Sequence, residues 1–404
     1  MTSLDTIIAT SRPPTRRIMA RLLKALMPRP TFGTLRLTTP GGEVIDYRGT
    51  QPGPEAALSL ARWRGIRRLI NGGDIGFAQA YIDGGWSTPD LPRLLEWALR
   101  NEDAFSRPTK GIPGTRLARR VAHRLRANTR RGSRRNIAAH YDLGNDFYAL
   151  WLDRGMSYSS ALFTSPHQTL ESAQEAKLDR IMTMLALSGG EQVLGVGIGW
   201  GGVVERLIAD HNCWVTGLTL SKEQHAYART RLDRLGLSGQ ADLRLQDYRD
   251  VEGRYDRIVS IEMLEAVGER YWPVYFDKLR ACLKPGGTCV LQVITIAEDR
   301  FDAYRETPDF IQSQIFPGGM LPTKTAVRDA AASSGLSLEM EDSFGSSYAL
   351  TLREWRNRFT ARRDEFTALG LDERFQRMWD YYLAYCEAGF AGGSVDVSLF
   401  KLRG

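Results

Sequence analysis

Residues 192–202 read Gln-Val-Leu-Gly-Val-Gly-Ile-Gly-Trp-Gly-Gly, an apolar strand that runs into a glycine-rich turn. The turn contains Gly197, Gly199 and Gly201, and a helix is expected directly after it. A strand–glycine–helix turn lets the backbone approach a ligand closely, because no Cβ stands in the way. One glycine turn is weak evidence for any nucleotide-binding fold, so the assignment depends on the segments around it.

Strands and helices alternate along the chain from about residue 136. This alternation predicts an α/β fold with a doubly wound, mostly parallel sheet, whose ligands bind at the carboxyl ends of the strands. The aromatic-rich segment 351–390 predicts helices that form core or a cap over the site. The predicted strands are 192–196, 214–218, 242–246, 256–261, 288–294 and 395–402, and the predicted helices between them are 203–209, 222–235 and 271–283.

The N-terminal part has a different pattern. Residues 32–48 alternate between apolar and polar around a Pro-Gly-Gly turn, which predicts a β-hairpin, and 55–72 and 88–100 have helical spacing. The predicted division is a small α+β domain over 1–105, a basic connector over 106–135 and a ligand-binding domain over 136–404.

The net charge of +7 is concentrated in the connector, since no acidic residue lies between Ala104 and Tyr141. The usual interpretation of such a run is a solvated linker. Leu117, Val121 and Leu125 recur at helical spacing within it, so a basic amphipathic helix on an anionic membrane is also predicted. Nucleic acid is disfavoured as a partner because no nucleic-acid motif accompanies the charge. The basic residues are Arg107, Lys110, Arg116, Arg119, Arg120, Arg124, Arg126, Arg130, Arg131, Arg134 and Arg135.

The four cysteines are scattered without paired spacing, which predicts neither a disulfide framework nor a zinc site, and no metal is expected. This usage is typical of a reducing cytoplasm. No apolar run approaches the length of a membrane span, and residues 1–30 lack a signal-peptide core. The expected location is therefore the cytoplasm, with peripheral attachment to the inner face of the membrane.

A series of ordered motifs resembles the cyclopropane-fatty-acyl-phospholipid synthase family. The motifs span about 140–400, and residues 74–86 add the N-terminal domain of that family. They are HYDLGNDFY (140–148), MSYSSALF (156–163), LESAQEAK (170–177), GIGWGG (197–202), GLTLSKEQ (217–224), QDYRD (246–250), IFPGGMLP (315–322) and FGSSY (344–348).

The resemblance implies a Rossmann-like methyltransferase that uses S-adenosylmethionine. Members of that family add the methyl group across the cis double bond of a phospholipid acyl chain, and a proton is then lost as a cyclopropane ring closes. That chemistry needs a dry pocket with aromatic faces and a base near the methyl group. The glycine turn adds Gly201 to the cofactor positions implied by the resemblance, which are Tyr158, Ser159, Gly197, Gly199, Thr219, Leu220, Gln224, Asp247 and Tyr248.

The base in that family is a bound bicarbonate ion. The resemblance places it beside Glu265, Ile294 and Tyr348, together with Ser160 and Gln292, where the family often has Cys and His. A backbone N–H at Ser160 and an amide donor at Gln292 are still able to bind an anion. Two further departures are Ala266, where His is common, and Gly195, where the family usually has an acidic residue whose loss is expected to weaken cofactor binding.

Several alternatives stay open at this point. Glu265 and Tyr348 have structural interpretations, as a helix N-terminal acid and as a packed aromatic. Proton loss elsewhere would give a methyl-branched or methylene acyl chain in place of a cyclopropane. A methyltransferase for a small molecule or nucleic acid is a further alternative, and Gly195 leaves open a lipid-binding protein that has lost catalysis. The sequence does not determine the oligomeric state, and a homodimer is among the open states.

Overall fold

The structure of the protein is a computed structural model that describes residues 27–104, 143–165 and 167–404, without side chains for 64–72. These residues form two compact units. The first holds the described residues up to 104 together with 370–392, and the second holds 143–369 and 393–404. The predicted basic connector and its amphipathic helix lie outside the described residues.

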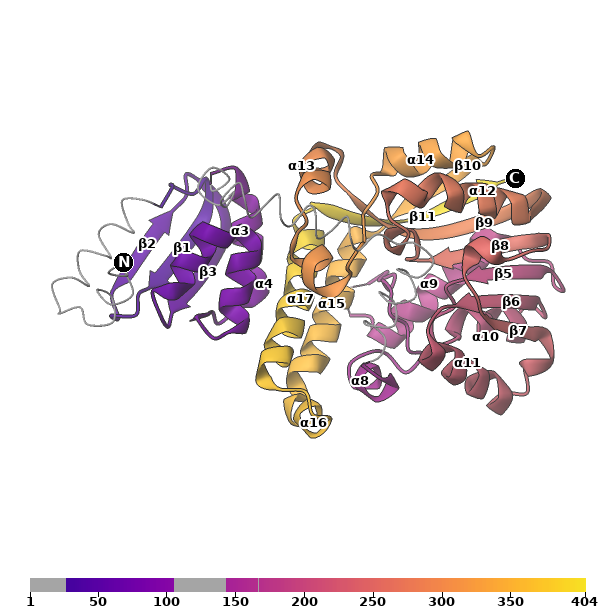
Figure 1. The fold of residues 1–404 in the computed structure, drawn as a ribbon, viewed down its shortest axis with the longest axis horizontal. Helices are drawn as coiled ribbons and strands as arrows, with labels where there is room; N and C mark the ends of the chain where they lie inside the picture. The colour runs from indigo at the N-terminus through magenta and orange to yellow at the C-terminus, as the bar shows by residue number, and fades with distance from the viewer. Residues whose placement is uncertain (1–26, 105–142, 166) are drawn as a thin grey trace. The chain divides into compact units, whose positions relative to one another are not determined.

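The second unit contains a seven-stranded sheet in the order β10-β11-β9-β8-β5-β6-β7 (Figure 1). Neighbouring strands from β9 to β7 are parallel, whereas β11 is antiparallel to both β9 and β10. The strand order reverses between β5 and β8, the kind of crossover at which doubly wound sheets bind ligands. The strands are β5 (Gln192–Val196), β6 (Trp214–Thr219), β7 (Ala241–Leu245), β8 (Tyr255–Ile261), β9 (Leu283–Ile296), β10 (Ser337–Ser343) and β11 (Val395–Arg403).

Both faces of this sheet are covered, as its sequence requires. Leu194 and Val196 of β5 pack into a core cluster with aromatic residues of α12, while Val193, which points to the other face, is also buried. Successive strand residues alternate between faces, so apolar residues on both sides need helices on both sides. The helices are α8 (Asn145–Ala149), α9 (Leu170–Leu185), α10 (Gly202–Ala209), α11 (Lys222–Arg234), α12 (Trp272–Cys282), α13 (Phe301–Glu306), α14 (Lys324–Ser333), α15 (Gly345–Ala361) and α16 (Arg363–Ala368).

These elements confirm the predicted fold class: β5 has the predicted bounds, and β6, β7, β8 and β11 differ from their predictions by one residue at one or both ends. Strand β9 is longer than predicted, because it begins at Leu283 and includes the turn-like Lys-Pro-Gly-Gly sequence. The sequence prediction had no counterpart to β10, whose residues are mostly exposed and lack a buried apolar alternation. The pairing of β10 with β11, and not its own pattern, therefore decides that it is a strand.

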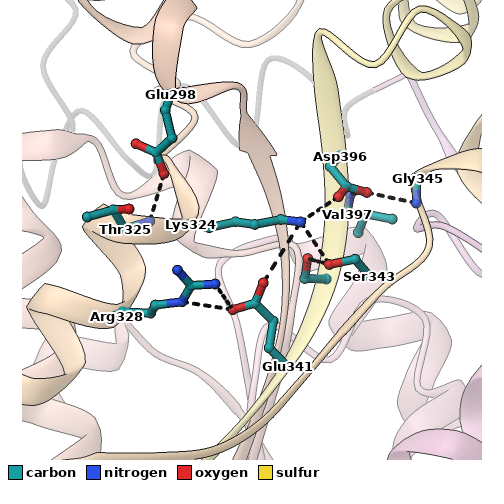
Figure 2. Close-up of polar contacts among 10 residues, drawn as sticks. Glu298, Lys324, Thr325, Arg328, Glu341, Ser343, Gly345, Asp396 and Val397 are labelled. Atoms are coloured by element: carbon teal, nitrogen blue, oxygen red, sulfur yellow. Dashed lines mark hydrogen bonds and ion pairs between the residues drawn. The ribbon is translucent and has the colours of Figure 1, made fainter.

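An ion-pair network holds α14 to this edge of the sheet (Figure 2). Lys324 Nζ lies 2.7 Å from Asp396 Oδ2 and donates to Ser343 Oγ at 2.8 Å. Asp396 Oδ1 accepts from the backbone N–H of Gly345, at the start of α15, at 2.8 Å. One carboxylate thus joins α14, β11 and the first turn of α15, where a negative charge is favourable.

The first unit has a four-stranded sheet in the order β2-β1-β3-β4. Strands β1 (Phe32–Thr38) and β2 (Val44–Arg48) form the predicted hairpin. The predicted helix over 55–72 is wrong in its first part, because β3 (Gln51–Leu60) pairs in parallel with β1. Its buried positions alternate along 54–60, a period-2 pattern that fits a strand. The remaining elements are α3 (Arg64–Ile82), β4 (Trp86–Ser87) and α4 (Leu91–Arg100).

The same unit also contains α17 (Glu373–Ala391), which the sequence analysis placed in the domain 136–404. Tyr81 donates its hydroxyl hydrogen to Asp380 Oδ2 at 2.8 Å, and the Arg377 guanidinium lies 4.2 Å from the Tyr81 ring centroid. Tyr81 and Trp86 both contact the ring of Tyr381. The aromatic face of α17 is therefore part of the core of the N-terminal unit, and the boundary predicted from sequence changes accordingly.

Among the described residues, no helix combines the length and the apolar character that crossing a bilayer would require.

Candidate functional site

A pocket in the second unit opens at the carboxyl ends of β5, β6 and β8. The glycine turn after β5 forms one wall, and the segment before α9 forms another. Of the residues predicted to bind the cofactor, those that line this pocket are Tyr158, Ser159, Gly197, Gly199, Thr219, Leu220, Gln224 and Tyr248. Gly201 and Asp247 do not line it.

The backbone of the glycine turn adopts a conformation that is strained for residues with a side chain. Gly197, Gly199 and Gly201 have φ of 79°, 54° and 90°, in the left-handed region that favours glycine. A Cβ at Gly197 would lie 2.4 Å from Met263 Cγ, and one at Gly201 would lie 3.1 Å from Ala228 Cβ. A Cβ at Gly199 would meet no atom within 4 Å, so Gly199 faces the open pocket. Gly201 thus supports the turn by packing against α11.

The end of β6 presents polar groups to the same pocket. Thr219 Oγ1 donates to Gln224 Oε1 at 2.9 Å and accepts from the backbone N–H of Ser221 at 3.1 Å. This arrangement uses the amide oxygen of Gln224 and leaves its amide nitrogen for a ligand. Asp247 instead forms an ion pair with Arg249, with an Oδ2–Nη2 distance of 2.6 Å.

Gly195 lies within β5, beneath the turn. A Cβ at this position would lie 3.0 Å from Ile198 Cγ2, and Ile198 is buried. The side chain of Ile198 therefore occupies the space beside Gly195, and its bulk replaces part of the volume that an acidic side chain would fill. Weaker cofactor binding because of Gly195 stays a prediction.

The groups predicted to bind bicarbonate separate into two clusters. Ser160, Gln292 and Tyr348 all donate hydrogen bonds to the carboxylate of Glu262, a residue to which the sequence analysis gave no role. Glu262 Oε1 accepts from the Ser160 backbone N–H at 2.9 Å and from Gln292 Nε2 at 2.8 Å. Glu262 Oε2 accepts from the Tyr348 hydroxyl at 2.8 Å.

Glu265 and Ile294 form the second cluster. The backbone N–H of Ile294 donates to Glu265 Oε1, whereas Glu265 Oε2 is buried without a hydrogen-bond partner among the described residues. Burial, and secondarily the charge of Glu262, raise the pKa of Glu265 to about 8. At neutral pH Glu265 is therefore mostly a neutral carboxylic acid.

Glu262 has an unusual backbone. It directly follows β8, has φ of 51°, and donates its backbone N–H to the Gln292 carbonyl oxygen at 2.8 Å. A non-glycine residue in this conformation costs on the order of 1 kcal/mol or more and is typical of functional sites. The signal in the sequence was an acidic residue immediately after a buried parallel strand, at the edge where ligands bind.

Lys177 is the second residue that sequence reasoning missed. It lines the pocket, is only 1% exposed, and donates from Nζ to Ser159 Oγ at 2.8 Å. Burial lowers its pKa to about 8, and the charges of Glu262 and Asp153 oppose that shift. The available signal was the spacing of Lys177, four residues from both Ala173 and Ile181, which places the lysine on the buried face of α9.

Aromatic rings border the pocket on the side of Tyr158. The Tyr158 ring centroid lies 5.4 Å from that of Tyr148 and 5.5 Å from that of Trp355. Tyr348 and Trp151 contact Trp355 with edge-to-face geometry. Such faces present negative electrostatic potential and favour a nearby cation.

Comparisons with known proteins identify the family. A model of the family "Mycolic acid cyclopropane synthetase" matches residues 128–400. The chain is 41% identical to tuberculostearic acid methyltransferase UfaA1 of Mycobacterium tuberculosis over 83% of this chain and 80% of that protein. It is 36% identical to the cyclopropane-fatty-acyl-phospholipid synthase of Escherichia coli over 82% of this chain and 84% of that protein.

Solved structures agree with this assignment. The cyclopropane synthase MmaA2 from Mycobacterium tuberculosis matches with a TM-score of 0.64 and 32% identity, covering 67% of this chain and 98% of that one. The mycolic acid cyclopropane synthase CmaA1, in a complex with SAH and CTAB, matches with a TM-score of 0.63 and 31% identity, covering 67% and 98%.

The pocket fits S-adenosylmethionine on its own geometry. The space in front of Gly199 is open, and a Cβ at this position would extend into it. Gln224, which follows the end of β6, offers an amide nitrogen to a ligand in the same pocket. The family match and the identity to the Escherichia coli synthase confirm the resemblance to the cyclopropane-fatty-acyl-phospholipid synthases. The chain belongs to the mycolic acid cyclopropane synthetase family and is an S-adenosylmethionine-dependent methyltransferase.

Proposed function

We propose that this enzyme methylates the carbon–carbon double bond of an unsaturated phospholipid acyl chain. The proposal rests on one pocket in which three features occur together. The glycine turn at Gly199 provides the cofactor wall, the ring of Tyr158 gives an aromatic border, and Glu262 supplies a carboxylate. Bound S-adenosylmethionine would supply an electrophilic methyl group, and an alkene attacked in this way becomes a cation that must lose a proton.

The residues of the chain then have separate tasks. Gly197 and Gly199 let the cofactor approach the backbone, and the aromatic cluster around Tyr158 and Trp355 excludes water and stabilises positive charge. The names of UfaA1 and of the Escherichia coli synthase support a fatty acyl acceptor. The CTAB in the CmaA1 complex supports a site that accepts a long alkyl chain.

The product that we favour is a methylene-branched acyl chain. In this route a hydride shifts to the neighbouring carbon, and the proton is lost from the added methyl group, so no external reductant is required. Glu262, Gln292 and Ser160 depart together from the bicarbonate arrangement implied for cyclopropane synthases, and UfaA1 is named as a tuberculostearic acid methyltransferase. Cyclopropane, the product expected from the sequence, is the second candidate and is supported by the identity with the Escherichia coli synthase.

Expression in a host that lacks its own enzyme of this family tests the proposal. We expect unsaturated fatty acids to decrease and a product one carbon heavier to accumulate in the phospholipid fraction. Gas chromatography with mass spectrometry separates a methylene branch from a cyclopropane ring of the same mass. Unchanged lipids, with soluble and folded protein in the cells, would refute acyl methylation.

We also propose peripheral attachment to the cytoplasmic face of an anionic membrane through the basic residues at 116–135. Each basic residue near such a surface contributes about 1 kcal/mol, and salt screens the attraction. Sedimentation with anionic vesicles should therefore show binding that falls steeply between low and high salt. Equal binding to neutral vesicles, without salt dependence, would contradict this expectation.

A further inference from the structure

We propose that Glu262 is the proton acceptor of the reaction, a carboxylate of the chain itself in the place where the family pattern implies a bicarbonate ion. The inference rests on the proposed acyl methylation. It differs from the sequence-based expectation, in which Ser160, Gln292 and Tyr348 would bind a free anion together with Glu265 and Ile294.

Hydrogen bonds from three neighbouring residues hold the carboxylate of Glu262. Three donors, from Ser160, Gln292 and Tyr348, meet its two oxygens at 2.8–2.9 Å. Ser160 and Gln292 are almost fully buried, so these donors have no access to bulk water. A bicarbonate ion would need the same donors, and the carboxylate already uses them. The Glu262 carboxylate therefore occupies the anion site that the sequence predicts.

The backbone fixes the carboxylate in this position. Glu262 has φ of 51°, and its N–H is bound to the Gln292 carbonyl oxygen. This conformation lets the side chain leave the end of β8 toward the pocket, where Glu262 lies beside Ile261 and Met263. Glycine would adopt the same backbone without strain, so the strained glutamate points to a function for its carboxylate.

The two buried glutamates differ in how strongly their surroundings favour the ionised form, and this difference makes Glu262 the base. Burial raises the pKa of Glu262, but three hydrogen bonds and the nearby charge of Lys177 favour its ionised form. Glu265 accepts only from Ile294 and its own backbone, and burial keeps it mostly protonated at neutral pH. A neutral carboxylic acid cannot accept another proton, whereas a carboxylate with a raised pKa is a stronger base than an exposed one.

The step balances without a further reagent. The electron pair of the double bond forms the new bond to the methyl carbon, and the sulfur keeps the pair of the bond that breaks. A C–H bond of the added methyl group then gives its proton to Glu262, and its electron pair forms the new carbon–carbon bond. After a hydride shift that pair forms the second bond of a C=CH2 branch, and without the shift it closes the cyclopropane ring. Glu262 returns the proton to solvent before the next turnover.

Two variants test the assignment. Glu262→Gln keeps the size of the side chain and removes its basicity, so we expect turnover to fall on the order of 100-fold. Affinity for S-adenosylhomocysteine should stay within about threefold, since the glycine turn is unchanged. Glu252→Gln, which changes an exposed acid outside the pocket, is the matched control and should retain wild-type turnover.

Glu262→Gly opens the anion site and suits the left-handed backbone. Bicarbonate should raise the turnover of this variant at least tenfold, whereas wild-type turnover should be the same in bicarbonate-depleted and supplemented buffer. A readout independent of activity is binding of carbon-13 bicarbonate followed by NMR in the S-adenosylhomocysteine complex. We expect binding to Glu262→Gly and none to the wild type.

The outcomes separate this inference from the proposed function. Bicarbonate binding to the wild type, or wild-type turnover in Glu262→Gln, would overturn the role of Glu262 while acyl methylation stands. Absence of methylated lipid from wild-type protein with unsaturated phospholipid vesicles would overturn acyl methylation, and the NMR comparison would still report whether Glu262 fills the anion site.

Discussion

Replacing Gly199 by valine is expected to weaken the binding of S-adenosylhomocysteine at least about 100-fold, which corresponds to about 2.7 kcal/mol. Gly199 has φ of 54°, and the space in front of its Cα is open pocket. A β-branched residue is strained in this conformation, and its methyl groups would project into the space that the cofactor needs. Isothermal titration calorimetry with the purified variant measures the effect.

The matched control is Gly236→Val. Gly236 has φ of 70°, and a Cβ there would also meet no atom within 4 Å, but this glycine lies exposed after the end of α11 and outside the pocket. It therefore suffers the same backbone strain without blocking the ligand. Equal affinities of wild type and Gly199→Val, with both folded by circular dichroism, would show that the turn does not bind the cofactor.

Replacing Glu265 by glutamine is expected to stabilise the protein above pH 8 relative to the wild type. The pKa of Glu265 is raised from 4.5 to about 8, mainly by burial. Between these values the folded state holds a proton that the unfolded state has lost, so wild-type stability falls as the pH rises through this range. Glutamine stays neutral, keeps the acceptor for the Ile294 N–H, and removes this dependence.

The difference should grow from near zero at pH 5 to a few kcal/mol at pH 9, as about 1.4 kcal/mol accompanies each pKa unit. Urea unfolding of both proteins at a series of pH values measures it. Glu252→Gln, at an exposed position, controls for the loss of one negative charge. A difference that is constant from pH 5 to pH 9 would mean that Glu265 is ionised in the folded protein throughout.

Local pattern determined much of this fold. The period of apolar residues and the glycine turn were enough to place β5, β6, β8 and the helices between them, because each of these segments is buried on the face that its sequence predicts. The resemblance to the family also named Thr219 and Gln224, and both line the pocket at the end of β6, the edge of the sheet where ligands bind.

Contacts between distant segments decided the rest. The helix α17 has an aromatic pattern that suits any core, and only packing against Tyr81 and Trp86 assigns it to the N-terminal unit. The exposed strand β10 is likewise defined by its partner β11.

The same distinction applies to the site. The sequence named Ser160, Gln292 and Tyr348 as groups that bind an anion, and it showed a glutamate at 262. It could not show that the glutamate is the anion they bind, because these donors lie 30 to 102 residues away from it along the chain. A left-handed backbone at one residue, fixed by its bond to Gln292, turns the carboxylate toward them. Hydrogen bonds depend on distance and direction in space, so only the tertiary structure could decide which anion fills the site.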